Sequence, residues 1–340
     1  MSIDSASPEF VKEVCDREDK LPVRNEMCRS QFRLHGGRRD KVILLFHGFT
    51  AAPYQFRTLG ELLYNSGYNV LVPLMPGHGQ AGAWGKENPA PLPEAIEPYQ
   101  AFALEWLGRA EELGDQVIVG GLSGGGCLAA WLAVEHGDRV DRAVLFAPYL
   151  SNCSLVVDLL SSRLNMYFQW RGGVWDDKCP GYQGFMFPAL RVFPKLGKQV
   201  LDEAHDRGGA PMFVISTETD IAVSNPDHRD LFDQVRSRVG ATWYYCFPRA
   251  LNVPHAMNAP EEGNQWVNVL NVMVKAYIES DVSWDEVETI ALRMTEGETC
   301  DQIVEALGMG DRVSRDFPTM MTMVDKLAIV MKQPGWSVDE

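Results

Sequence analysis

A glycine-rich turn between a strand and a helix constrains the fold of this chain more than any other stretch. Residues 116–120 form a short segment rich in β-branched side chains, as in a buried strand. Residues 124–136 form an apolar segment that is long enough for a helix. Between them lies Gly-Leu-Ser-Gly-Gly at positions 121–125. Glycine is needed because such a turn forces an unfavourable backbone angle and brings strand and helix too close for side chains. The sequence therefore predicts a serine, Ser123, at the tip of a strained turn.

The stretch fits the pattern G-x-S-x-G, the nucleophile elbow, which exposes a serine hydroxyl on a strand-to-helix turn. The helix that follows points its N-terminal amides at the same place, where negative charge is stabilised. A glycine-rich loop that cradles a phosphate is the alternative interpretation. No Gly-Lys-Ser/Thr follows, however, and a P-loop is therefore excluded. Ser123 is accordingly our candidate nucleophile.

The composition favours a folded α/β protein and argues against several kinds of partner. With 340 residues, 46% of them hydrophobic, the chain can bury a large core, as one domain or as a domain with an appendage. A net charge of −15 argues against nucleic acid and against an anionic membrane surface. Residues 1–5 lack the features of a signal peptide, and no apolar run approaches the length of a membrane span. We expect a small-molecule substrate and no stable membrane insertion.

The seven cysteines are scattered, odd in number and without CxxC spacing. This pattern favours free thiols in a reducing cytoplasm and argues against structural zinc. A Cys153–Cys179 bridge is the alternative to free thiols. The sequence therefore predicts a cytoplasmic chain without a metal or an organic cofactor.

Predicted strands alternate with helical stretches from residue 27 onward, which favours right-handed crossovers and a mostly parallel sheet. The predicted strands are residues 27–35, 42–46, 68–73, 116–120, 142–147, 211–216 and 242–247, and the main predicted helices are 56–64, 99–113, 124–136 and 265–278. Gly36 and Gly37 predict a hairpin turn after the first strand. The expected fold class is α/β, with helices flanking the central sheet.

Four segments follow from this alternation. We predict an N-terminal extension at residues 1–26, a core at 27–148 and 210–280, and an insertion at 149–209. The insertion is too long for a simple strand-to-helix connection and is rich in aromatic residues. It is therefore expected to form a lid over the carboxyl ends of the strands, where ligands bind in such sheets. An aromatic surface excursion without a role is the alternative.

The last segment, residues 281–340, is predicted to be an acidic helical appendage. It holds 13 acidic against 5 basic residues, and this charge argues against DNA binding. Ser283 with Glu286, and Thr299 with Gln302, match the capping-box pattern. We expect three short helices, the last at 318–331, which pack against the core or form a contact between two copies of the chain.

A serine hydroxyl becomes a strong nucleophile only when a histidine accepts its proton and a carboxylate orients that histidine. In this kind of sheet the expected chain order is serine, acid, histidine. Asp220 lies in the turn after the strand at 211–216 and is favoured as the acid. Glu218, two residues earlier on the same face of an extended segment, is the rival.

His255 is the only histidine after the last predicted strand, which makes it the candidate base. His47 and His78 lie in loops at the same end of the sheet, and we interpret them as structural hydrogen-bonding residues. An oxyanion hole requires two backbone N–H groups aimed at the developing charge. Gly124, after the serine, supplies one; Phe49, in the loop after the strand at 42–46, is the best candidate for the other, with Thr50 as the alternative.

Five short motifs in this order resemble the α/β-hydrolase superfamily, in its bacterial carboxylesterase and monoacylglycerol-lipase-like branch. They are His-Gly-Phe-Thr at 47–50, Pro-Gly-His-Gly at 76–79, Gly-Leu-Ser-Gly-Gly at 121–125, Thr-Glu-Thr-Asp at 217–220 and Val-Pro-His at 253–255. The resemblance covers about residues 27–278 and implies a Ser-His-Asp esterase with a lid before the acid-bearing strand. The extra glycine at Gly126 and the acidic appendage depart from the family's pattern.

The leading hypothesis is hydrolysis of esters with small to medium apolar acyl or aryl groups. The same site could serve a thioesterase, a lactonase, an aminopeptidase or a carbon–carbon bond hydrolase. Haloalkane dehalogenase and epoxide hydrolase chemistry is disfavoured, because those enzymes use an aspartate where Ser123 stands. A ligand-binding protein that kept the fold without the chemistry is the non-enzymatic alternative.

Overall fold

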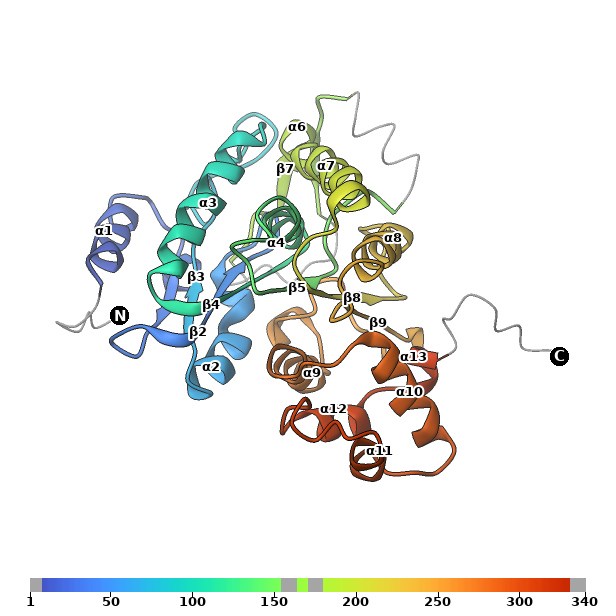
Figure 1. Cartoon of the computed structure of the whole chain (residues 1–340). Helices are drawn as coiled ribbons and strands as arrows, with labels where there is room; N and C mark the ends of the chain where they lie inside the picture. The colour runs from blue at the N-terminus through green and yellow to red at the C-terminus, as the bar shows by residue number, and fades with distance from the viewer. Residues whose placement is uncertain (1–7, 154–163, 171–179, 331–340) are drawn as a thin grey trace.

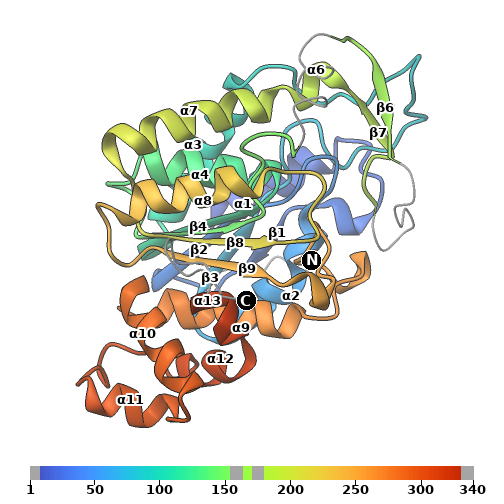
Figure 2. The ribbon, with the colours of Figure 1, turned by 90° about the vertical axis from the view of Figure 1, so that its right-hand side faces the viewer.

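A mostly parallel seven-stranded sheet forms the centre of the chain (Figures 1 and 2). The computed structural model describes residues 8–153, 164–170 and 180–330. The strands run in the order β1-β3-β2-β4-β5-β8-β9, and every neighbouring pair is parallel except β1 with β3. Their bounds are β1 Gln31–Arg33, β2 Arg39–Phe46, β3 Asn69–Val72, β4 Gly114–Leu122, β5 Arg142–Phe146, β8 Met212–Thr217 and β9 Trp243–Phe247. The predicted α/β class is confirmed.

Helices cover both faces of the sheet. In Figure 2, α3, α4 and α8 lie on one face, and α2 and α9 lie on the other. The helices of the core and of the N-terminal region are α1 Glu9–Glu18, α2 Arg57–Asn65, α3 Glu97–Glu111, α4 Gly124–Glu135, α8 Asn225–Arg236 and α9 Val267–Glu279. Double coverage explains why residues 42–46 of β2 form one continuous apolar run, since all of them have 0% exposure.

The predicted hairpin after the first strand is wrong. β1 pairs with β3 and not with the strand that follows it, with Gln31 opposite Val72. Gly36 does adopt a positive φ of 73°, so the chain turns there as expected. The turn signal is local, however, and β3 occupies the edge of β2 at which a hairpin partner would pair. The first strand therefore becomes the antiparallel edge of the sheet.

The interval predicted as a lid contains two kinds of structure in its described parts. The strands β6 Tyr167–Gln169 and β7 Gly184–Met186 form a small antiparallel pair outside the main sheet. After the short helix α6 Phe187–Leu190, helix α7 Val192–Arg207 packs along α4 in the layer that covers the sheet. The interval thus ends in a helix of the core layer, and a lid role for its earlier part stays a prediction. Cys179, and with it the possible bridge to Cys153, lies outside the described residues.

The acidic segment folds into helices that lie below the sheet beside α9 (Figure 2). Their bounds are α10 Trp284–Thr295, α11 Cys300–Ala306, α12 Phe317–Met323 and α13 Lys326–Val330. Both predicted capping boxes are present, at Ser283 and at Thr299. The predicted helix at 318–331 is broken in two, because the backbone N–H of Asp325 leaves the helical pattern and donates to the Tyr245 hydroxyl at 3.1 Å.

Trp243 of β9 joins the acidic segment to the sheet. Its side chain is 1% exposed, and its ring lies 6.4 Å from that of Trp284 and 5.9 Å from that of Phe317. Its indole N–H also donates to the carbonyl of Val282 at 2.8 Å. Of the two arrangements expected for this segment, packing against the core is therefore present in the structure. A contact between two copies of the chain remains a prediction.

Phe317→Ala should lower the free energy of unfolding by about 3–5 kcal/mol, because it removes a fully buried ring from the Trp243 cluster. Met323→Ala is the matched control in the same helix, since Met323 is 43% exposed and should cost about 0.5 kcal/mol or less. Urea denaturation followed by tryptophan fluorescence measures both values. Equal losses of stability in the two variants would contradict this packing.

Candidate active site

Ser123 occupies a strained turn between β4 and α4. Its φ of 57° and ψ of −116° lie in a region that non-glycine residues rarely adopt. A Cβ atom on Gly121 would lie 2.2 Å from the carbonyl oxygen of Gly125, and one on Gly125 would lie 2.1 Å from that of Phe46. The glycines of the motif are therefore required by the close approach of helix and strand, as the sequence predicted.

Gly126, the extra glycine, has a similar steric explanation. A Cβ atom there would lie 2.9 Å from the Gly121 carbonyl oxygen and 3.0 Å from the Cα of Pro148, in the loop after β5. The first turn of α4 thus lies against two neighbouring strands of the sheet. The extra glycine, which departs from the family's pattern, is therefore explained by the close packing of this helix.

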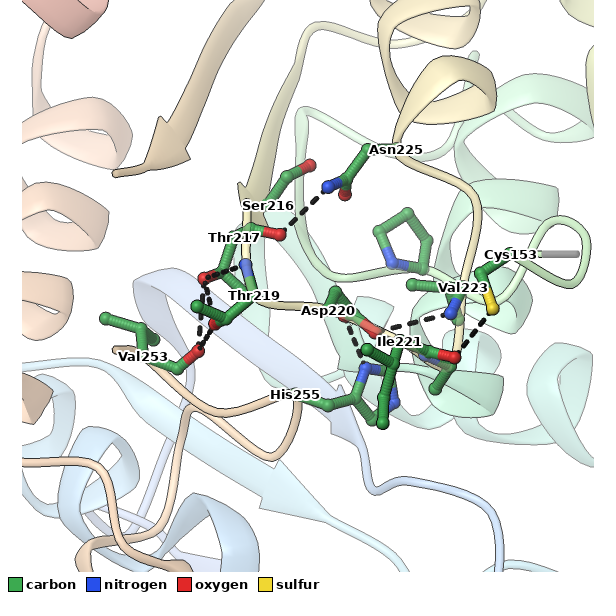
Figure 3. A network of polar contacts seen from close by, with 12 residues as sticks. Cys153, Ser216, Thr217, Thr219, Asp220, Ile221, Val223, Asn225, Val253 and His255 are labelled. Carbon is green, nitrogen blue, oxygen red and sulfur yellow. Dashed lines mark hydrogen bonds and ion pairs between the residues drawn. The ribbon is translucent and has the colours of Figure 1, made fainter. Parts of the chain in front are cut away.

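Asp220 and His255 are in direct contact at the carboxyl end of the sheet (Figure 3). Nδ1 of His255 lies 2.7 Å from Oδ2 of Asp220. The other carboxylate oxygen of Asp220 accepts the backbone N–H groups of Ala222 at 2.8 Å and Val223 at 3.3 Å. The carboxylate is therefore held on both sides, and the imidazole is oriented by it.

The carboxylate of Glu218, the alternative acid, contacts the segment after β9 and forms no hydrogen bond with His255 in the described residues. It accepts the backbone N–H of Arg249 at 2.9 Å. The structure thus brings His255 together with Asp220, the acid that the sequence favoured, because Asp220 lies in the turn beyond the end of β8. Glu218 instead links that turn to the segment after β9.

Two threonines hold the acid turn against the loop that carries the histidine. The hydroxyls of Thr217 and Thr219 donate to the same carbonyl oxygen, that of Val253, at 3.0 and 2.5 Å (Figure 3). Val253 lies two residues before His255 in the sequence. The separation between the two loops is therefore set by direct hydrogen bonds, and this favours a fixed Asp220–His255 geometry.

The charges of the pair stabilise each other. Burial alone would raise the pKa of Asp220, but the charge of His255, the hydrogen bond to it and the two amides outweigh burial and lower the pKa below 3.8. Burial alone would likewise lower the pKa of His255, but the charge of Asp220, its hydrogen bond and the charge of Glu262 raise the pKa above 6.5. The imidazole is therefore a stronger base than an isolated histidine.

Ser123, Asp220 and His255 follow three parallel strands, β4, β8 and β9. The carboxyl ends of these strands lie at the same end of the sheet. Within the described ranges the hydrogen bonds include the Asp220–His255 contact but none between the Ser123 hydroxyl and the imidazole.

The two residues expected to supply the oxyanion-hole amides follow the carboxyl ends of β4 and β2, which are neighbouring strands of the sheet. Gly124 is the first residue of α4, and its amide has no intrahelical partner. Phe49 follows Gly48, whose carbonyl oxygen accepts the amide N–H of Ala51 at 3.1 Å and lies 3.0 Å from Nδ1 of His47. The alternative residue, Thr50, has a positive φ of 66°, and its carbonyl accepts the N–H of Tyr182 at 2.7 Å.

Aromatic rings, which we call the aromatic wall, pack against the side chain of Phe49 and beside Gly124. The ring of Phe49 lies 5.1 Å from that of Phe185 and 5.2 Å from that of Phe193. A Cβ atom on Gly124 would lie 2.8 Å from the ring of Phe193, which is fully buried. The walls of the site are therefore apolar and come from the insertion as well as from the core.

Three further histidines near this edge are structural. Nε2 of His47 accepts the Met75 amide at 3.0 Å, and burial lowers the pKa of this imidazole well below its ordinary value. His78 is buried, with a pKa lowered to about 4. His228, which the sequence did not single out, lies between the Ser216 hydroxyl at 2.8 Å and the Pro148 carbonyl at 2.7 Å, and burial lowers its pKa to about 4. All three are therefore neutral at physiological pH.

The described ranges hold no group of three or more His, Cys, Asp or Glu side chains that could bind a metal ion. No helix in these ranges is both long and apolar enough to cross a bilayer.

A family model described as the alpha/beta hydrolase fold matches residues 41–199. Among curated proteins, the thermostable monoacylglycerol lipase of Bacillus sp. (strain H-257) is 32% identical over 96 residues, which cover 28% of this chain and 36% of the lipase. Epoxide hydrolase A of Mycobacterium tuberculosis (strain ATCC 25618 / H37Rv) is 25% identical over 233 residues, which cover 61% of this chain and 67% of that enzyme. The match to the monoacylglycerol lipase thus spans about a third of that lipase's length.

Solved structures agree on the fold. The monoacylglycerol lipase of Paleococcus ferrophilus has a TM-score of 0.55 at 18% identity and covers 72% of this chain and 95% of its own. A soluble variant of the Saccharomyces cerevisiae monoglyceride lipase has a TM-score of 0.55 at 13% identity, with 72% and 89% covered. The family model over residues 41–199 and these solved structures together show that the chain has the α/β-hydrolase fold, and the proteins it is similar to include lipases.

The electrostatic coupling in the site gives a test that does not depend on activity. In the wild-type chain, NMR titration of the histidine Cε1–H signals should place the pKa of His255 above 6.5, and Asp220→Asn should lower it, because the carboxylate stabilises the imidazolium. Glu218→Gln removes the same charge two residues away and should leave this pKa nearly unchanged. His255→Asn assigns the signal by its loss. A larger shift in Glu218→Gln than in Asp220→Asn would reverse the assignment of the acid.

Proposed function

We propose that this chain is a serine hydrolase that cleaves carboxylic esters through an acyl-enzyme. The observation that carries the proposal is the 2.7 Å contact between His255 and a buried Asp220, at the sheet edge where Ser123 is held in a strained turn. A neutral histidine that a carboxylate orients in this way can accept a proton from a serine hydroxyl, and the carboxylate then stabilises the imidazolium that forms.

The proposed reaction has two halves. The Ser123 hydroxyl attacks the ester carbonyl while His255 takes its proton, and Asp220 stabilises the imidazolium that forms. The amides of Phe49 and Gly124 donate to the oxyanion of the tetrahedral intermediate. The imidazolium then protonates the leaving alcohol, and water, activated by the same histidine, releases the acid from Ser123.

The nature of residue 123 separates this proposal from the chemistry of one relative. Epoxide hydrolases use an aspartate as the nucleophile, whereas this chain has a serine at that position. The matched lipases are described by their names as acting on monoacylglycerols or monoglycerides. An ester is therefore the substrate class that the nucleophile and the relatives together support.

The apolar wall suggests which esters fit. Phe49, Phe185 and Phe193 are all buried and pack edge to face around the proposed oxyanion hole. We propose small to medium apolar acyl or aryl groups as the preferred substrates. The six described cysteines form no disulfide with one another, and we further propose a reducing compartment such as the cytoplasm.

Ser123→Ala should reduce hydrolysis of p-nitrophenyl butyrate by at least about 10⁴-fold in kcat, because the acyl-enzyme cannot form. It should also abolish labelling by a fluorophosphonate probe. Ser66→Ala, at an exposed serine after α2, is the control and should react like the wild type. Hydrolysis that survives Ser123→Ala would refute the mechanism, and a wild-type chain that neither turns over esters nor takes up the probe would favour a binding protein.

A graded series of p-nitrophenyl esters should locate the acyl preference. We expect kcat/KM to peak between acetate and octanoate and to fall at least about tenfold for palmitate, because the buried aromatic wall limits the acyl pocket. Phe193→Ala should move this optimum toward longer chains. A profile that rises steadily to palmitate would contradict the proposed pocket size, although not the triad.

A further inference from the structure

A chain of hydrogen bonds, which we call the Gly48–Gln55–Glu262 relay, joins the loop after β2 to the loop after His255. The backbone N–H of Gly48 donates to Oε1 of Gln55 at 2.8 Å. Nε2 of Gln55 in turn donates to Oε1 of Glu262 at 2.7 Å. Gln55 is 3% exposed, so its side-chain amide spans a buried gap between two segments 207 residues apart in the sequence. Sequence reasoning singled out neither Gln55 nor Glu262.

The relay has a direction that Glu262 determines. A glutamine side chain has a donor end and an acceptor end, whereas a carboxylate only accepts hydrogen bonds. Because Glu262 takes the NH₂ end of Gln55, the oxygen end must face the Gly48 amide. If residue 262 could not accept a hydrogen bond, the amide could turn over and place its NH₂ group against the Gly48 N–H, which leaves a buried N–H unsatisfied.

The relay ends on the peptide that carries a proposed oxyanion donor. Both polar groups of Gly48 are held, the N–H by Gln55 and the carbonyl by the Ala51 amide, and this fixes the planar peptide that includes the Phe49 N–H. A Cβ atom on Gly48 would lie 3.7 Å from the carbonyl oxygen of Leu122, the residue before Ser123. The relay therefore constrains the orientation of the Phe49 amide in a loop that lies against Leu122, the residue before the candidate nucleophile.

Glu262 also acts on the histidine by its charge. Its negative charge contributes to the raised pKa of His255, together with Asp220. Ionisable groups near this point also include His228, which is neutral, and Glu261, which forms an ion pair with Arg57. Burial raises the pKa of Glu262, whereas hydrogen bonds from Gln55 and Tyr54 lower it.

We propose that Glu262 is a positioning residue of the esterase site: through Gln55 it orients the Phe49 amide, and through its charge it stabilises the protonated form of His255. The inference rests on the proposed function, because both targets belong to the proposed machinery. Glu262 touches no reacting atom.

Two substitutions separate the hydrogen bond from the charge. Glu262→Gln can still accept from Gln55, so kcat on p-nitrophenyl butyrate should stay within about threefold of the wild type at high pH, while the acidic limb of the kcat/KM profile moves to lower pH. Glu262→Leu breaks the relay and should lower kcat by about 10- to 100-fold with little change in KM. Glu261→Gln removes an equal charge one residue away and should leave kcat unchanged, with a smaller shift of the limb than Glu262→Gln.

Exchanging the two partners tests the direction of the relay. Gln55→Glu alone places two carboxylates face to face and should lose as much kcat as Glu262→Leu. The double variant Gln55→Glu/Glu262→Gln restores a donor opposite an acceptor and an acceptor opposite Gly48, so kcat should recover to within about fivefold of the wild type. A double variant no better than Gln55→Glu, or a Glu262→Leu variant with wild-type kcat, would overturn the relay.

Amide hydrogen exchange separates failure of this inference from failure of the proposed function. In a peptide that covers residues 46–56, Glu262→Leu and Gln55→Glu should speed exchange, and the double variant should restore wild-type protection, whether or not the chain cleaves esters. If no ester is hydrolysed but this pattern holds, the proposed function fails and the relay stands. Unchanged exchange in both single variants would overturn the relay even in an active esterase.

Discussion

The rest of the site depends on the close approach of α4 to the carboxyl ends of β2 and β4. This approach leaves room only for glycine at positions 121 and 125, and it holds Ser123 at a φ of 57°. The strain persists because the backbone of Ser123 is bonded on both sides: its N–H donates to Phe146, and its carbonyl accepts the N–H of Tyr149, each at 2.9 Å. The loop after β5 therefore holds the turn in place, and α3 and α7 bury α4 from its two flanks.

The other half of the site is held by side chains more than by regular structure. Thr217 and Thr219 fasten the acid turn to the histidine loop, and Gln55 connects the histidine loop to the loop after β2. Tyr182, in the insertion, donates its N–H to the Thr50 carbonyl and its hydroxyl to the Gly77 carbonyl. Four loops from distant parts of the chain are thus linked to one another. Such links matter for the proposed reaction, because it needs several groups held at fixed relative positions.

The acidic appendage has a different role from the loops around the site. Its Trp284 and Phe317 rings pack against Trp243, the first residue of β9, at the opposite end of this strand from the loop that carries His255. Its acidic residues stand mainly on the outside, where Arg312 pairs with Glu286 and Arg293 pairs with Glu298. The segment therefore extends the hydrophobic core at β9 and adds charge to the surface, without a contact to His255 or Asp220 in the described residues.

The sequence by itself determined the features whose cause is local. Glycine sterics predicted the turn at Ser123, the alternation of strands with helical stretches predicted the mostly parallel sheet, and side-chain capping predicted the helix starts at Ser283 and Thr299. Only the tertiary structure decided that β1 pairs with β3, that a hydrogen bond to Tyr245 breaks the last helix, and that Gln55 meets Glu262. Each of these depends on which residue, tens or hundreds of positions away, supplies the partner for a polar group, and no local pattern of side chains encodes that choice.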